Sequence, residues 1–137
     1  MNTSFILCFI LIFLPYEIEN YNKKINEAIS PVTPIIVTAT TYRPTEEETD
    51  TTPNITASGF KIDLNNPKRH KIIAVSRDLK RKWPFGSKVY IKGVGKHDGI
   101  YVVRDVMNKR YKKRIDILIG HQDKQITYKK VKAFKLN

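Results

Sequence analysis

Short segments in which apolar and polar residues alternate recur along the last hundred residues of the chain. Alternation of this kind is typical of strands that bury one face. The segments are IIVTATTYR (35–43), ITASGFKID (55–63), KIIAVS (71–76), PFGSKVYIKG (84–93), GIYVVRD (99–105), RIDILIG (114–120) and TYKKVKAFKL (127–136). Many short strands at roughly ten-residue spacing, with Gly, Pro and Asn between them, predict a compact β-barrel rather than βαβ units. The stretch SRDLKRKW (76–83) predicts one helical turn, capped by the hydroxyl of Ser76.

The first third of the chain has a different pattern. An unbroken apolar run from Phe5 to Leu14 resembles the hydrophobic region of a secretory signal. It is shorter than the roughly 20 residues that a spanning helix needs. We therefore expect a signal-like segment over 1–15, a polar linker over 16–34 and the barrel over 35–137. The alternative for the run is a buried N-terminal helix. Because the single cysteine, Cys8, lies in this run, no disulfide framework is possible.

Charge divides the chain unevenly. Residues 1–63 contain four Lys or Arg and eight Asp or Glu, whereas residues 64–137 contain twenty-one and five. A basic half of this strength attracts polyanions such as nucleic acid, anionic lipid headgroups or anionic cell-wall polymers, and charge alone does not choose among them.

Two aspartates stand out in the basic half. In the segment 114–120, Ile115, Ile117 and Ile119 share one face, which we assign to the core, while Arg114, Asp116 and Leu118 share the other. Partial burial beside Leu118 predicts a raised pKa for Asp116, which is what a proton donor requires. The alternative is an ordinary ion pair of Asp116 with Arg114 or Arg104. Asp105 ends the preceding strand, where an aspartate commonly accepts hydrogen bonds from the backbone amides that follow it, so a structural role competes with a catalytic one.

These segments resemble the 3D domain, a family named for three aspartates. The resemblance is carried by AVSRD, GIYVVRDVMN and RIDILIG, with TATTYRP and TASGFKID upstream, and by the eleven-residue separation of Asp105 and Asp116. It implies a six-stranded double-psi β-barrel related to membrane-bound lytic transglycosylase A and to stationary-phase survival proteins. It further implies that Asp116, in the motif R-I-D, is the catalytic acid, and that Asp105 lies in the same cleft and supports it.

The same resemblance implies a substrate, the glycan strand of peptidoglycan, and a set of residues that contact it. Thr40 and Tyr42 match the T-x-Y motif near the groove, and we also expect contacts from Arg114 and Asp78. Asp78 stands two positions later than the family's first aspartate, because Ser76 follows Ala74-Val75 directly. The expected activity is that of a lytic transglycosylase with Asp116 as its single acid and base, in an exported, monomeric protein of the periplasm or cell envelope without a membrane span after processing.

Two other functions compete with this expectation. The same barrel can hold a glycan without cleaving it, since a fold alone confers no chemistry. The basic half and its tyrosines are compatible with nucleic-acid binding, although the strand pattern assigns those tyrosines to the core, and we expect no nucleic-acid partner. His70, His97 and His121 are too far apart in sequence to suggest a metal site, so we expect no metal and no other cofactor. His121 is the histidine nearest to the expected cleft.

Overall fold

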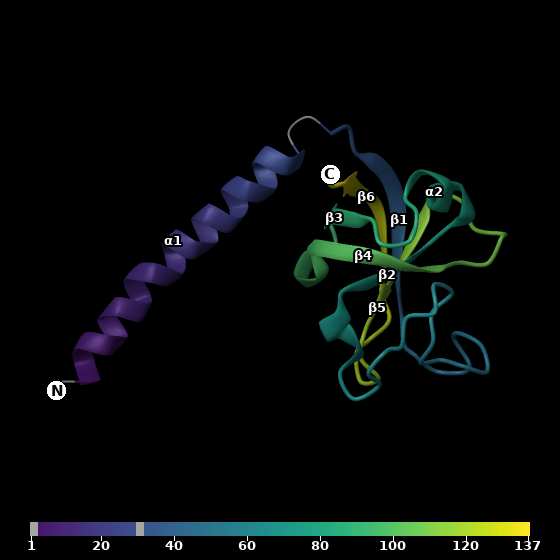
Figure 1. The fold of residues 1–137 in the computed structure, drawn as a ribbon, viewed down its shortest axis with the longest axis horizontal. Coiled ribbons are helices and arrows are strands. Elements are labelled where there is room, and N and C mark those ends of the chain that lie inside the picture. Colours follow the sequence, from purple (N-terminus) through teal and green to yellow (C-terminus); the bar gives the residue numbers. More distant parts are fainter. Residues whose placement is uncertain (1–2, 30–31) are drawn as a thin grey trace. The chain divides into compact units, whose positions relative to one another are not determined.

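The computed structural model describes residues 3–29 and 32–137, with side chains from residue 14 to 28 and from 32 onward. Six strands form a closed barrel in the order β1-β5-β2-β4-β3-β6 (Figure 1). Pairs β1–β5 and β2–β4 are parallel, and the other four pairs are antiparallel. The strands are β1 (Ile35–Tyr42), β2 (Ile72–Val75), β3 (Lys88–Lys92), β4 (Gly99–Val106), β5 (Arg114–Leu118) and β6 (Thr127–Lys135). The prediction of a mainly β, six-stranded barrel is confirmed, and this mixed topology is compatible with a double-psi barrel.

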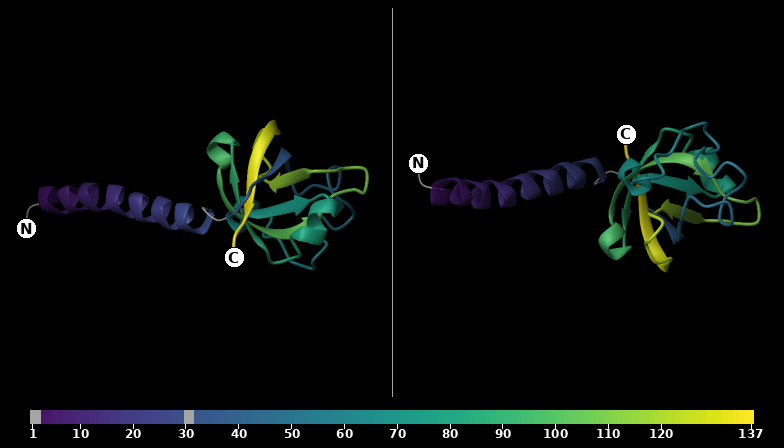
Figure 2. Two further views of the ribbon diagram at one scale, coloured as in Figure 1. Left: turned by 90° about the horizontal axis from the view of Figure 1, so that it is seen from above. Right: turned by 90° about the horizontal axis from the view of Figure 1, so that it is seen from below.

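The interior of the barrel is filled by the inward side chains of its strands. On β5, Ile115 and Ile117 are buried in the main core together with Ile119, as the alternation predicts. The first and last strands meet, since β1 pairs with β6 and closes the sheet without a free edge (Figure 2). Closure thus provides a rigid wall on which outward side chains can be placed.

A second, smaller cluster lies on the outer side of the sheet. It consists of buried Tyr42, Ile62, Ile72, Ala74, Met107 and Leu118, with Phe60 and Tyr111 packed against it. Two of these side chains, Ile62 and Phe60, come from the long connection between β1 and β2, which folds across β2 and β5. The connection therefore covers part of the sheet that would otherwise expose apolar surface.

The prediction of a strand over 55–63 is wrong. The segment forms one isolated bridge between Ile55 and Lys61, and the chain turns at Gly59, whose φ of 81° is left-handed. Two of its alternating apolar residues, Phe60 and Ile62, pack in the outer cluster, and the segment does not pair with a strand of the barrel.

The helical turn after β2 forms as helix α2 (Arg77–Lys82), preceded by Ser76, but the predicted cap is wrong. The Ser76 hydroxyl makes no capping hydrogen bond; it accepts one from the backbone N–H of Arg114 on β5, at 3.1 Å. Ser76 is fully buried, so its hydroxyl serves the neighbouring strand instead of its own helix. Two short 3-10 turns, η1 (Pro67–His70) and η2 (Gly95–His97), complete the barrel's connections.

The N-terminal part is described by itself. Helix α1 (Thr3–Ile29) continues through Pro15 and includes most of the segment for which the sequence predicts a linker. The chain divides into two compact units, Met1–Thr33 and Pro34–Asn137. Within the described residues, no helix combines the length and the apolar character that crossing a membrane requires.

Candidate functional site

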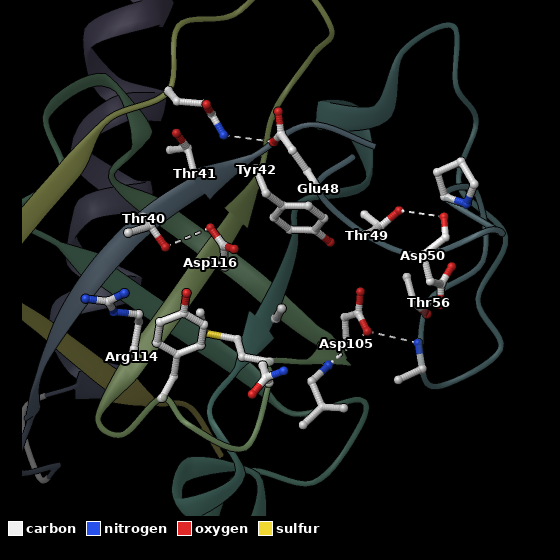
Figure 3. A pocket seen from close by; sticks show the side chains of 18 of the residues that line it. Thr40, Thr41, Tyr42, Glu48, Thr49, Asp50, Thr56, Asp105, Arg114 and Asp116 are labelled. Atoms are coloured by element: carbon white, nitrogen blue, oxygen red, sulfur yellow. Dashed lines mark hydrogen bonds between the residues drawn. The ribbon is translucent and has the colours of Figure 1, made fainter. Parts of the chain in front are cut away.

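An open groove of about 940 Å³ lies on the outer side of the barrel, against β1, β2 and β5. Its walls come from the β1–β2 connection, from the end of β4 with the loop that follows it, and from the start of β6 (Figure 3). Four carboxylates line the groove, those of Glu48, Asp50, Asp105 and Asp116, and three guanidinium groups, those of Arg77, Arg110 and Arg114.

The floor of the groove is one row of residues across four strands. In the pairing register, Asp105 on β4 and Asp116 on β5 both lie opposite Ala74 on β2, and Asp116 also lies opposite Thr40 on β1. Neighbouring strands are about 4.8 Å apart, so the Cα atoms of the two aspartates are separated by roughly 10 Å. The small side chain of Ala74 between them leaves space for a ligand.

A β-bulge brings Asp105 into this row. Strict alternation on β4 would place Asp105 on the same face as Tyr101 and Val103, which are buried in the core. The register of β2 against β4 shifts between Ile73 and Ala74, so that Ala74 lies opposite Asp105. The extra residue turns the Asp105 side chain out of the core and toward the groove, a common effect of bulges near functional sites.

Asp116 is held without a cationic partner. Its Oδ1 accepts a hydrogen bond from the Thr40 hydroxyl at 2.9 Å, and it forms no ion pair with Arg114 or Arg104 in the described structure. Burial raises the pKa of Asp116 to about 7. The Thr40 hydrogen bond and the charge of Arg114 oppose this rise, whereas the charges of Glu48 and Asp105 add to it. The carboxyl group can therefore give up and regain a proton near neutral pH.

Asp105 combines a structural contact with a place in the groove. Its Oδ1 accepts hydrogen bonds from the amides of Val106 and Ala57, both at 2.9 Å, which fastens the β1–β2 connection to the end of β4. Burial raises its pKa, and the two amides oppose that rise. The Tyr42 hydroxyl, which lies close to the Asp105 carboxyl group, also opposes the rise of its pKa.

Tyr42 lies in the same groove (Figure 3). Its hydroxyl is buried and lies close to the Asp105 carboxyl group, with which it interacts without reaching the geometry of a full hydrogen bond. Burial raises the pKa of the phenol well above its usual value, and the charges of Asp105 and Asp116 add to the effect. The hydroxyl stays protonated, and it is available as a donor close to both carboxylates.

The remaining predicted contact residues divide into two groups. The structure brings Thr40, Tyr42 and Arg114 to the groove with the two aspartates, whereas Asp78 does not line it. Asp78 is in the first turn of α2 and its Oδ2 accepts a hydrogen bond from the amide of Lys113 at 3.0 Å. His121 is also outside the groove, with its Nε2 at 3.1 Å from the carbonyl oxygen of Leu64.

Sequence reasoning missed Glu48, which lies in the acidic loop after β1. Its carboxylate forms an ion pair with Arg43, at 2.7 Å, and accepts a hydrogen bond from the side-chain amide of Gln125, at 2.9 Å. Glu48 thereby joins the β1–β2 connection to the loop before β6. The acidic run alone gave no sign that one of its three glutamates turns inward.

No protein-family model matches the chain, and no curated protein matches its sequence. Among the described residues, no three His, Cys, Asp or Glu side chains come together in a way that could hold a metal ion.

Proposed function

We propose that the protein is a lytic transglycosylase that cleaves the bond between N-acetylmuramic acid and N-acetylglucosamine in peptidoglycan. The observation that carries the proposal is the state of Asp116. Its carboxyl group lies on the floor of an open groove, is hydrogen-bonded to Thr40, forms no ion pair with any described residue, and has a pKa of about 7. The resemblance of its motifs to the 3D domain supports the choice of substrate.

In the proposed reaction Asp116 acts first as acid and then as base. The protonated carboxyl group donates its proton to the glycosidic oxygen as the bond from that oxygen to C1 of the muramic residue breaks. The 6-hydroxyl oxygen of the same residue forms a new bond to C1 and closes a 1,6-anhydro ring. The Asp116 carboxylate accepts the proton of that hydroxyl, which restores the starting state without consuming water.

The spacing of the two aspartates supports one acid rather than a nucleophilic pair. Retaining hydrolases hold their two carboxyl groups about 5 to 5.5 Å apart. The amides of Ala57 and Val106 hold Oδ1 of Asp105 at the end of β4, and β2 lies between β4 and the strand of Asp116, which does not favour such a pair. Asp105 instead adds negative charge that keeps the Asp116 proton in place and favours the positive charge that develops at C1.

The second candidate is a glycan-binding barrel without activity. The position of Asp78 favours this candidate. Its carboxylate accepts a hydrogen bond from the Lys113 amide outside the groove, so it does not act as the third aspartate of a catalytic set.

The test is digestion of purified sacculi, followed by mass spectrometry of the soluble products. We expect the wild type to release anhydro-muropeptides and Asp116→Asn to release none while retaining its fold. Products with reducing ends only would refute the transglycosylase mechanism, and an active Asn variant would show that Asp116 is not the acid. Binding to sacculi without any product would establish the second candidate.

A matched control comes from the same loop region. Glu47 is exposed, does not line the groove, and forms no hydrogen bond or ion pair among the described residues, so Glu47→Gln removes one carboxylate of the acidic loop without altering the groove. We expect this variant to digest sacculi at the wild-type rate.

A further inference from the structure

Three arginines line the groove without a carboxylate partner. Arg77 belongs to α2, Arg110 to the loop after β4, and Arg114 to β5. Among the described residues none of the three lies within ion-pair distance of an Asp or Glu, whereas Arg43 on the connection is neutralised by Glu48 at 2.7 Å. Within the described part of the chain, the three arginines that line the groove are therefore left without an acidic partner, whereas Arg43 has one.

Two of these guanidinium groups are ordered by an aromatic ring. Those of Arg110 and Arg114 lie over the ring of Tyr111, 4.8 Å and 4.7 Å from its centroid, and Arg110 also donates a hydrogen bond to the Tyr111 hydroxyl at 2.7 Å. Stacking on an aromatic face lowers the cost of fixing a long side chain and leaves the planar N–H donors available for a ligand.

The backbone at the third arginine, Arg77, is fixed relative to the strand that carries Arg114. The amide of Ser76 donates to the Arg114 carbonyl at 2.9 Å, and the Ser76 hydroxyl accepts from the Arg114 amide. Asp78 holds the amide of Lys113 next to it. The start of α2, which includes Arg77, is therefore fastened to the start of β5. Asp78 thus has a positioning role in place of the expected contact with the substrate.

Like charges held together cost energy unless an anion offsets them. We propose that Arg77, Arg110 and Arg114 form an anion-recognition site for the carboxylates of a peptidoglycan strand. These are the lactyl carboxylate of a muramic residue that carries no peptide, and the peptide's own carboxylates where the lactyl group is amide-linked to a peptide. The inference rests on the proposed function for its substrate. Arginine is suited to this ligand, since its fork of donors matches a carboxylate in a bidentate manner.

The arrangement of charges favours such a glycan over nucleic acid. Figure 3 shows Arg114 on one side of Asp116, and Asp50 and Asp105 on the other. A nucleic acid would bring a phosphate to the acidic side at every nucleotide. A peptidoglycan strand bears its carboxylates on the muramic residues or on their peptides, so it can place the neutral N-acetylglucosamine residues there. Single-stranded nucleic acids also need free aromatic faces, and the ring of Tyr111 is occupied by guanidinium groups.

The test compares two oligosaccharides that differ in the lactyl ether of the muramic residues and in the carboxylate that it carries. Calorimetric titrations in the uncleaving Asp116→Asn background would use an alternating N-acetylglucosamine–N-acetylmuramic acid tetrasaccharide and the neutral tetramer of N-acetylglucosamine. We expect the acidic ligand to bind about tenfold more tightly, as one charge-assisted pair provides. Adding Arg110→Gln, or Arg77→Gln with Arg110→Gln, should remove most of this preference and leave the affinity for the neutral tetramer unchanged.

Arg81→Gln is the matched control, because Arg81 is an exposed residue of α2 outside the groove. Equal affinity for the two ligands, a preference that survives in the arginine variants, or no binding of either ligand would overturn the inference. Tighter binding of a single-stranded oligonucleotide, lost in the same variants, would overturn its assignment to glycan. The lytic activity is measured separately. Product release by the wild type without any preference for the acidic ligand would contradict only the anion site. An arginine-dependent preference without product release would contradict only the lytic proposal.

Discussion

At the scale of single residues, Asp116 shows how a reactive group is kept at the expense of stability. Its carboxyl group is largely removed from water and has a hydroxyl, not a guanidinium, as its partner. The charged form is therefore disfavoured. Natural proteins commonly retain such unfavourable groups only where a function needs them.

This predicts a stability effect of Asp116→Asn that depends on pH. In the unfolded chain the aspartate titrates near pH 3.9, whereas burial raises its pKa in the folded state to about 7. Between these values the folded protein holds a proton that the unfolded chain releases, so the aspartate costs stability increasingly as pH rises. We expect the Asn variant to match the wild type at pH 4 and to exceed it by on the order of 3 kcal/mol at pH 8, measured by urea unfolding.

Asp123 provides a control of opposite sign. The amide of Gly120 and the ammonium of Lys68 lower its pKa, so its ionised form adds stability at neutral pH that is lost in acid. Asp123→Asn should be less stable than the wild type at pH 8 and at pH 4, and should approach it only when the pH falls below the lowered pKa of Asp123 in the folded state. A constant difference between Asp116→Asn and the wild type across this range would contradict the raised pKa.

At the scale of elements, the bulge on β4 and the connection after β1 build the groove together. The sequence carried a sign of the bulge, since strict alternation puts Asp105 on a core face with Tyr101 and Val103, where an unpaired carboxylate is costly. The sequence contained little indication of how the connection between β1 and β2 crosses the sheet. Phe60 and Ile62 in 55–63 resemble strand residues until the outer face of β2, on which they pack, is known.

Asp105→Ala tests the fastening of that connection. Loss of its carboxylate leaves the Ala57 and Val106 amides without their acceptor, which we expect to cost about 1 to 3 kcal/mol of unfolding free energy. Amide exchange at Ala57 and Ser58 should accelerate, while exchange in β6 stays slow, as measured by NMR. Asp105→Asn retains an acceptor oxygen and should lie closer to the wild type. Unchanged exchange at Ala57 in the Ala variant would show that the connection is held by its apolar contacts alone.

At the scale of the whole molecule, alternation predicted the barrel because closure buries one face of every strand. The buried face requires an apolar residue at every second position, which is visible in the sequence. Six of the seven predicted segments became strands of the barrel. The partner of Asp116 was harder to predict. Opposite charge pointed to Arg114 or Arg104, but the parallel pairing of β1 with β5 places Thr40 opposite Asp116. Register between distant strands is a property of the closed sheet, which local pattern does not specify.

The division of the chain gives the last prediction. Both apolar clusters draw their residues from the unit Pro34–Asn137, and all six strands belong to it. A chain that begins at Pro34 should therefore fold by itself and unfold in one transition. We expect its midpoint in calorimetry to lie within about 4 °C of the full chain, which corresponds to less than about 1 kcal/mol for a domain of this size. A larger decrease of the midpoint would mean that the first 33 residues stabilise the barrel. Digestion of sacculi by the shortened chain would then be measured at a temperature at which that chain is fully folded.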